Sequence, residues 1–305
     1  MEDWLLQIDE PKRGKVRIEY ENAKSLDKKI ELLYSHHPKG HLSPLPVKHL
    51  DDYLKCIRLT TTDSSWFRGQ SKEYSNLIPK IYRNIQESDV DHILVKERKY
   101  FLEFKRRAKS LVNPFPDHDD WSWYFLIQHY GGPTRLLDWT SNAAVALFMA
   151  LDTDRDSLEN PIVYTLSPTV LSDYAYKDLG KENDKKGSVL YPGEDVTNNW
   201  ISNLNNGNDG IPDSPIALLP AYSDTRIIAQ KSCFTLFGKR VNGFVKDNNE
   251  ILCPCCEKKI IHRIIIDGSK KESLRKELSK IGVTSETVYP GLEGLNKDIF
   301  QEIFC

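Results

Sequence analysis

Residues that could bind a ligand or take part in a reaction are concentrated between Gln128 and Ser141. This segment places a histidine, a tyrosine, two threonines, an arginine, an aspartate and a tryptophan around the pair Gly131-Gly132. Because glycine has no Cβ, the backbone can approach a ligand closely at this pair. A helix expected to begin at Ala143 would add backbone N–H groups that attract an anion. These features predict a polar binding site with a place for an anion.

The alternative to a binding site is that the polar residues of this segment serve only to stabilise the fold. Arg135 and Asp138 would then pair internally, His129 would cap a turn, and Trp139 would belong to the core. Polar groups between buried elements are costly unless they are paired or used. We favour a functional site, because so many residues with special properties coincide in one short segment.

The elements that position this segment follow from hydrophobic periodicity and turn residues. The clearest amphipathic pattern runs from Ser88 to Leu111, with Glu97 among its apolar positions and a basic opposite face. A basic face can bind nucleic acid, but the net charge of −2 favours a solvated helix surface. A capping box, Ser269-x-x-Glu272, predicts a further helix that ends before Gly282. Helices are also predicted at residues 47–59, 119–130, 143–151 and 292–303, and strands at 66–69, 135–138, 162–166, 216–219, 226–229, 233–237 and 260–266.

Interleaved helices and strands around the apolar helix 143–151 predict a mixed, α+β fold with small central sheets flanked by helices. Residues 1–45 contain several prolines and glycines and are interpreted as an N-terminal extension. Residues 46–305 are expected to form one domain, with a polar insertion at about 172–212.

Composition limits the compartment and the partners. The start of the chain lacks the pattern of a signal peptide, and no apolar run approaches the roughly 20 residues of a membrane span. Six cysteines in 305 residues are too few for a disulfide scaffold. We therefore expect a cytoplasmic protein without membrane or nucleic-acid partners.

Cysteine spacing raises zinc as a further candidate ligand. Cys253 and Cys256 form one Cys-x-x-Cys pair, which Cys233 and His262 could complete as a tetrahedral site. A second Cys-x-x-Cys pair is missing, so free thiols are favoured and zinc is the alternative.

The segment also resembles a known family. Trp66-Phe67-Arg68-Gly69-Gln70 resembles the opening of FRG domains, and Gln128–Thr140 followed by Ala143–Ala150 resembles their most recognisable block. The resemblance spans residues 50 to 300, more loosely after residue 226. It implies membership of the FRG domain family.

FRG domains in turn are distantly similar to ADP-ribosyltransferases, which implies an ADP-ribosyltransferase-like core. Those enzymes use an Arg, a Ser or Thr before a helix, and a Glu on a third strand. The resemblance assigns these roles to Arg68, to Thr140-Ser141, and to the neighbourhood of Gln230. Gln230 is neutral and cannot stabilise an oxocarbenium ion, so Asp138 or Asp224 would have to replace the glutamate.

The resemblance implies a nucleotide-binding protein with NAD as substrate and with ADP-ribosyltransferase or NAD-glycohydrolase activity, acting as a toxin or anti-phage effector. A protein could serve as partner or acceptor. The alternatives are a non-catalytic module that binds a ligand or protein, and a nuclease. The expected catalytic residues are Arg68, Asp138, Thr140 and Gln230. The expected nucleotide contacts are Arg68, His129, Tyr130, Gly132, Thr134, Arg135, Trp139 and Ser141.

Overall fold

The structure is a computed structural model that divides the chain into two interleaved units. It describes residues 46–304 except 62–63, 75–76, 113–119, 155–156, 181–187, 193–210, 222–223, 247–248 and 251–259, and before residue 46 only 17, 19 and 22. The first unit comprises Met1–Glu73, Asn142–Ser167 and Pro254–Cys305. The second comprises Tyr74–Ser141 and Pro168–Cys253.

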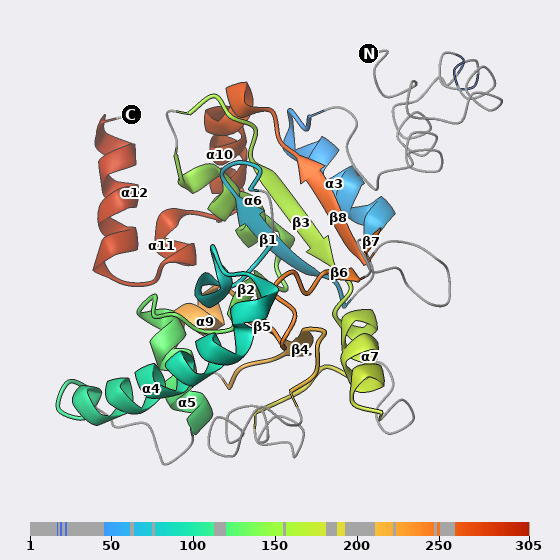
Figure 1. Cartoon of the computed structure of the whole chain (residues 1–305). Coiled ribbons are helices and arrows are strands. Elements are labelled where there is room, and N and C mark those ends of the chain that lie inside the picture. The colour runs from blue at the N-terminus through green and yellow to red at the C-terminus, as the bar shows by residue number, and fades with distance from the viewer. Residues whose placement is uncertain are drawn as a thin grey trace. The chain divides into compact units, whose positions relative to one another are not determined.

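Three antiparallel strands form the sheet part of the first unit. They are β1 (Trp66–Gln70), β3 (Ile162–Leu166) and β8 (Ile261–Ile265). β3 lies in the middle, with Trp66 of β1 opposite Leu166 and Ile265 of β8 opposite Ile162 (Figure 1). All five residues of β3 are buried, as expected for a central strand covered on both faces.

Helices α3 (Leu50–Thr60), α6 (Ala143–Asp152) and α10 (Lys271–Lys280) complete the core of this unit. α6 contacts both β1 and β3, and it supplies most of its apolar side chains to one buried cluster. Asn142 caps α6, since its side chain accepts hydrogen bonds from the backbone N–H groups of Ala144 and Val145. Two more helices, α11 (Ser285–Val288) and α12 (Leu292–Phe304), end the chain.

Gly69 allows β1 and α6 to approach each other closely. A Cβ at this position would lie 2.0 Å from the carbonyl oxygen of Ala146 and 2.7 Å from the backbone nitrogen of Ala150. Neither atom is the end of a flexible side chain, so helix and strand would have to separate. The glycine of the Phe67-Arg68-Gly69 tripeptide is thus required for packing.

Replacing Gly69 with alanine is expected to lower the free energy of unfolding by about 1–3 kcal/mol, the usual cost of overpacking a core. Urea denaturation followed by circular dichroism measures the change. Gly131→Ala is the comparison: Gly131 has φ +69° and no heavy atom within 4 Å of the added Cβ, so only the backbone penalty of about 1 kcal/mol applies. A Gly69→Ala variant as stable as the wild type would contradict the close packing.

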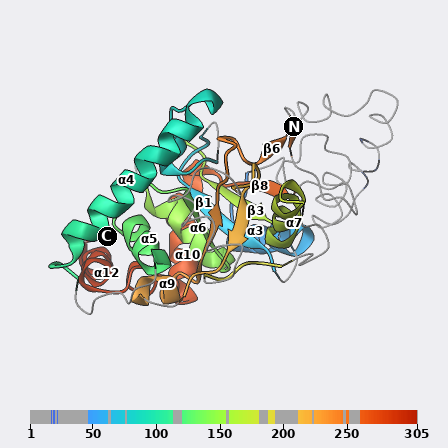
Figure 2. The same ribbon diagram turned by 60° about the horizontal axis from the view of Figure 1, so that its bottom comes forward.

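The second unit has its own three antiparallel strands and a helical layer. β5 (Ser232–Leu236) lies between β4 (Ile216–Leu218) and β2 (Leu136–Thr140), with Leu136 opposite Leu236. The long helix α4 (Val90–Ala108) contacts α5 (Asp120–His129) (Figure 2). Helix α7 (Pro168–Asp178) contacts β4. Aromatic residues of α5, including Trp121, Trp123 and Tyr124, are buried in the apolar cluster of this unit.

The smaller elements of the second unit connect its strands and long helices. Two short 3-10 helices, η2 (Lys80–Tyr82) and η3 (Glu87–Asp89), precede α4. α9 (Thr225–Ala229) precedes β5, and the short strands β6 (Val245–Lys246) and β7 (Asn249–Glu250) pair with each other.

Most of the predicted elements are confirmed within two or three residues, and the α+β class with them. The strand predicted at 226–229 is wrong, because these residues form α9. Asp224 explains the difference: its side chain accepts a hydrogen bond from the N–H of Arg226 and starts a helix. The capping box at Ser269 is also wrong, since α10 begins at Lys271 and Ser269 lies in the preceding 3-10 helix η4 (Gly268–Lys270), which Asp267 caps.

The segment interpreted as a polar insertion begins inside α7, where Ser172, Ala175 and Tyr176 are buried. Most of the rest, residues 181–187 and 193–210, lies outside the described residues. In the described part of the chain, no helix combines the length and the apolar character that a bilayer span requires.

Candidate functional site

The segment Gln128–Ser141 leaves the end of α5, turns, and runs along β2. Gly131 adopts φ +69° and Gly132 donates a backbone hydrogen bond to Ile127, which together end the helix. A Cβ on Gly132 would lie 2.5 Å from Cγ2 of Ile127. The glycine is therefore needed for close packing against Ile127, and the contact of Gly132 with a ligand stays a prediction.

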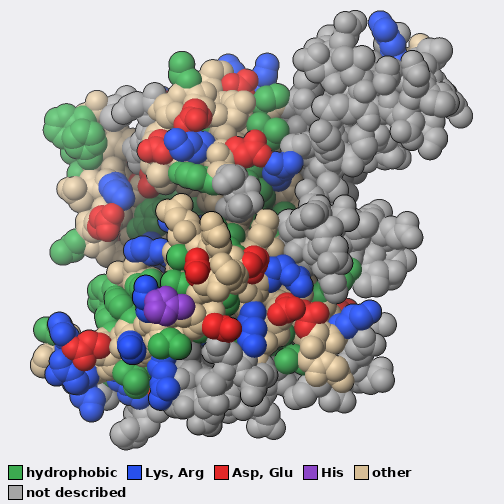
Figure 3. Space-filling view, in the orientation of Figure 1, with side chains coloured by type: hydrophobic (Ala, Val, Ile, Leu, Met, Phe, Trp, Pro, Cys, Tyr) green, Lys and Arg blue, Asp and Glu red, His purple; other side chains and the backbone are tan. Residues whose placement is uncertain are grey.

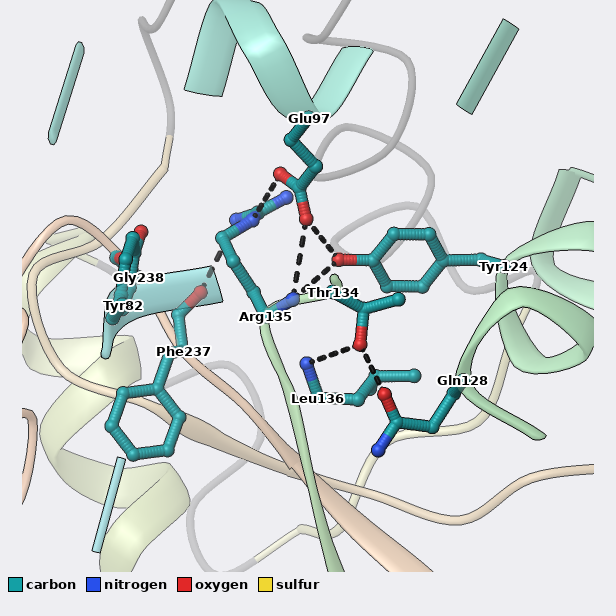
Figure 4. Close-up of polar contacts among 9 residues, drawn as sticks. All are labelled: Tyr82, Glu97, Tyr124, Gln128, Thr134, Arg135, Leu136, Phe237 and Gly238. Carbon is teal, nitrogen blue, oxygen red and sulfur yellow. Dashed lines mark hydrogen bonds and ion pairs between the residues drawn. The ribbon is translucent and has the colours of Figure 1, made fainter. Parts of the chain in front are cut away.

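Arg135 lies in the interior of the second unit. Its Nε donates to Glu97 at 2.8 Å, and Nη1 donates to the carbonyl oxygen of Phe237 at 3.2 Å (Figure 4). The hydroxyl of Tyr124 also donates to Glu97 and accepts a hydrogen bond from the backbone N–H of Arg135. Arg135 and Glu97 are both fully enclosed. Arg135 thus takes the internal role of the structural alternative, with Glu97 rather than Asp138 as its partner.

The guanidinium of Arg135 stays charged although it is fully buried. Burial lowers the pKa of Arg135, but the carboxylate of Glu97 outweighs this and holds the pKa above its ordinary value. Burial and Glu97 both raise the pKa of Tyr124, so its hydroxyl stays a donor. The enclosed guanidinium therefore stabilises the start of β2. The predicted contact of Arg135 with a nucleotide stays a prediction.

A relay of hydrogen bonds runs from the interior to the surface at Asp138. The buried hydroxyl of Thr134 donates to the side-chain oxygen of Gln128 (Figure 4). The amide nitrogen of Gln128 then donates to both carboxylate oxygens of Asp138, at 3.0 Å each. Asp138 is the exposed residue of β2, so the relay orients a carboxylate that faces solvent. Thr134 takes part as a buried support.

His129 and Asp224 form a second polar pair in this unit. Nδ1 of His129 lies 3.0 Å from a carboxylate oxygen of Asp224, the same residue that caps α9. The next residue, Tyr130, is 72% exposed, and its ring meets the imidazole edge-on at a centroid distance of 5.0 Å. A carboxylate on one ring nitrogen fixes the orientation of a histidine.

Trp139, Thr140 and Ser141, at the end of β2, and Gln230, at the end of α9, have different environments. Thr140 is buried and its hydroxyl donates to the carbonyl oxygen of Gln230 at 2.6 Å, while Ser141 is exposed. Gln230 itself is nearly buried at the end of α9. Trp139 belongs to the core, where its indole N–H donates to Thr235.

Asp138 and Thr140 lie on the same face of β2, because side chains alternate along a strand. Their Cα atoms are therefore roughly 7 Å apart. Asp138 thus lies two residues along β2 from the threonine whose hydroxyl contacts the backbone carbonyl of Gln230.

Arg68 belongs to the first unit, where it lies on β1 opposite Tyr164 of β3. The other residues predicted to bind or cleave the nucleotide, Ser141 included, belong to the second unit. One cleft shared by Arg68 and these residues therefore stays a prediction.

The zinc proposal stays a prediction as well. Cys253 and Cys256 lie outside the described residues. Cys233 is buried in β5, and this burial raises the pKa of its thiol, which disfavours the thiolate that zinc binds. His262 lies on β8 opposite Thr165. Among the residues that the structure describes, no group of three or more His, Cys, Asp or Glu side chains is placed to hold a metal ion.

A cavity of about 530 Å³ lies in the first unit, bounded by α10, α11 and α12. None of the predicted site residues lines it. We therefore define the candidate site by five polar or aromatic residues of the second unit, called the signature surface from here on: Gln128, His129, Tyr130, Asp138 and Asp224.

The sequence interpretation missed two residues that organise this surface. Glu97 lies at an apolar position of an amphipathic helix, and a charge there signals a buried partner. Gln128 had no such signal, since its role depends on the turn that returns Thr134 and Asp138 to it.

Comparison with known families supports the interpretation of the signature. The model of the FRG domain matches residues 63–159, which include Phe67-Arg68-Gly69 and the whole segment Gln128–Ser141. The chain therefore contains an FRG domain, and its contiguous sequence supplies elements to both units. No curated protein and no solved structure matches the chain.

Proposed function

We propose that the signature surface, with Arg68, binds an NAD-like nucleotide and that the protein cleaves its nicotinamide bond. Water or a protein side chain would accept the ADP-ribose. The resemblance that assigns ADP-ribosyltransferase roles to Arg68, Thr140 and the Gln230 position supports this proposal, which includes an ADP-ribosyltransferase-like core. A role in toxicity or anti-phage defence rests on the same resemblance, and the proposed cytoplasmic location rests on the sparse cysteines.

The position of Asp138 is the observation that carries the proposal. When the C–N bond to nicotinamide breaks, its electron pair leaves with nicotinamide and the ribose becomes an oxocarbenium ion. A carboxylate stabilises that cation, and Gln230 cannot. Asp138 is exposed, held by Gln128, and lies on the same strand face as the threonine that contacts Gln230. We assign to Asp138 the role of the missing glutamate.

The remaining residues have roles that fit their surroundings. With Nδ1 of His129 engaged by Asp224, proton transfer from an attacking water would pass through Nε2. The exposed ring of Tyr130 offers a face on which a base can stack. The guanidinium of Arg68 would bind a phosphate as a bidentate fork.

A second candidate function is a non-catalytic binding module. The structural use of Arg135, Thr134 and Thr140 favours it, since three residues of the signature serve the fold. Such a module would bind the nucleotide, or a protein, without turnover.

Incubation with NAD and measurement of released nicotinamide distinguishes the two candidates. We expect release by the wild type, and a loss of about 10- to 100-fold for Arg68→Ala, because charge-assisted hydrogen bonds contribute about 1.5–3 kcal/mol. Arg58→Ala is the control, since Arg58 is an exposed arginine on α3. Binding without release would support the module, and full activity of a folded Arg68→Ala variant would contradict the assignment of Arg68.

A further inference from the structure

The C-terminal helix α12 is attached to its own unit by its polar side. A Cβ on Gly294 would lie 2.1 Å from the carbonyl oxygen of Tyr289, so the glycine allows α12 to contact the backbone next to α11. The carboxylate of Asp298 accepts the backbone N–H groups of Ser285 and Glu286 at 2.9 and 2.7 Å. The side chain of Gln301 accepts a hydrogen bond from Arg275 at 2.9 Å.

The carboxylate of Asp298 is adapted to this anchoring role. Burial raises its pKa, but hydrogen bonds from Thr284, Glu286 and Ser285 outweigh that effect and hold the pKa below the ordinary value. Asp298 is therefore ionised at neutral pH and binds the N-terminal turn of α11 firmly. These contacts anchor α12 through one side. The side chains on the opposite side are exposed.

That opposite side carries large apolar side chains along the whole helix, with the exposed Asn296 among them. Figure 3 shows hydrophobic side chains on the surface over α12, at the left of the view. Six large apolar side chains of α12 are between 37 and 84% exposed: Leu292, Leu295, Ile299, Phe300, Ile303 and Phe304. The rings of Phe300 and Phe304 stack on each other with centroids 5.0 Å apart. An apolar face of this extent on an anchored helix marks an interaction surface.

The geometry points to a second copy of this chain as the partner: we propose that two chains associate by packing the apolar faces of their α12 helices against each other. Full burial of the six side chains would remove on the order of 700 Å² from each chain. A standard protein interface buries roughly 800 Å² per partner. The apolar face alone therefore provides almost the area of a stable dimer.

Light scattering coupled to size-exclusion chromatography, at several concentrations of the full chain, tests the proposal. We expect a mass twice the 35.2 kDa of one chain. A mass that stays at one chain at the highest concentration overturns the proposal, whether another part of the chain or a different molecule covers the face.

Variants then locate the interface. Ile299→Glu places a charge at the centre of the apolar face and is expected to yield a monomer. Leu111→Glu is the control: Leu111 is 83% exposed, lies outside α12, and its replacement should leave the dimer intact. If Ile299→Glu does not fold, Phe304→Ser in the last turn is expected to raise the dimer dissociation constant by about tenfold or more. A folded α12 variant that dimerises like the wild type overturns the proposal.

Discussion

Replacing Arg135 with leucine is expected to lower the free energy of unfolding by about 3–5 kcal/mol, the cost of leaving one partner of a buried ion pair alone. The carboxylate of Glu97 would remain enclosed without its guanidinium, and the carbonyl of Phe237 would lose a donor. Urea denaturation followed by tryptophan fluorescence is suited to the measurement, because Trp121 and Trp123 are buried in the same unit.

Two further variants show that the effect comes from the unpaired charge. The double variant Arg135→Leu/Glu97→Leu removes both charges and is expected to be more stable than Arg135→Leu alone. Arg106→Ala breaks an exposed ion pair with Glu103 and should leave the stability unchanged. An Arg135→Leu protein that is as stable as the wild type but has lost affinity for NAD would instead assign Arg135 to ligand binding.

Replacing Asp138 with asparagine is expected to lower the rate of nicotinamide release about 100- to 1000-fold, a typical cost of removing one group that stabilises transition-state charge. The dissociation constant of NAD should change little, because the positive charge on the ribose develops only as the bond breaks. Single-turnover kinetics for the rate and calorimetry for binding separate the two quantities.

Asparagine retains an oxygen that Gln128 can bind, so this variant keeps the fold and tests charge alone. Asp89→Asn is a matched control, since Asp89 is an exposed aspartate of the same unit and its side chain makes no cap hydrogen bond to α4. Equal losses in binding and in rate for Asp138→Asn would identify Asp138 as an ordinary ligand contact rather than a catalytic group.

The elements around the signature could be predicted because their signals are local. An apolar helix of ten residues, α6, follows a polar cap, and the glycine pair ends α5 where a positive φ is needed. α9 could not be predicted from its isoleucines, which suggest a strand. The side chain of Asp224 accepts a hydrogen bond from the backbone N–H of Arg226, and this capping contact outweighs the preference of β-branched residues for strands.

The sequence indicates which segment carries the candidate site, but it does not indicate which residues of that segment are enclosed and which are exposed. The sequence predicts that both Arg135 and Asp138 contact the ligand. In the structure Arg135 is enclosed in the interior, whereas Asp138 is exposed. The difference depends on Glu97, which lies 38 positions before Arg135 and reaches it only through the packing of α4 against α5. Sequence patterns report which residues are special, whereas long-range packing decides which of them face solvent.

Calorimetric titration of the whole chain with NAD tests the central proposal most directly, with Arg68→Ala and Tyr130→Ala as variants. The account predicts binding with a dissociation constant between about 1 μM and 1 mM, the range in which enzymes commonly bind substrates. Both variants should bind at least about tenfold more weakly, and Tyr191→Ala, an exposed tyrosine outside the signature surface, should bind like the wild type. Absence of binding by the folded wild type at millimolar NAD, or binding that neither variant weakens, would contradict the account.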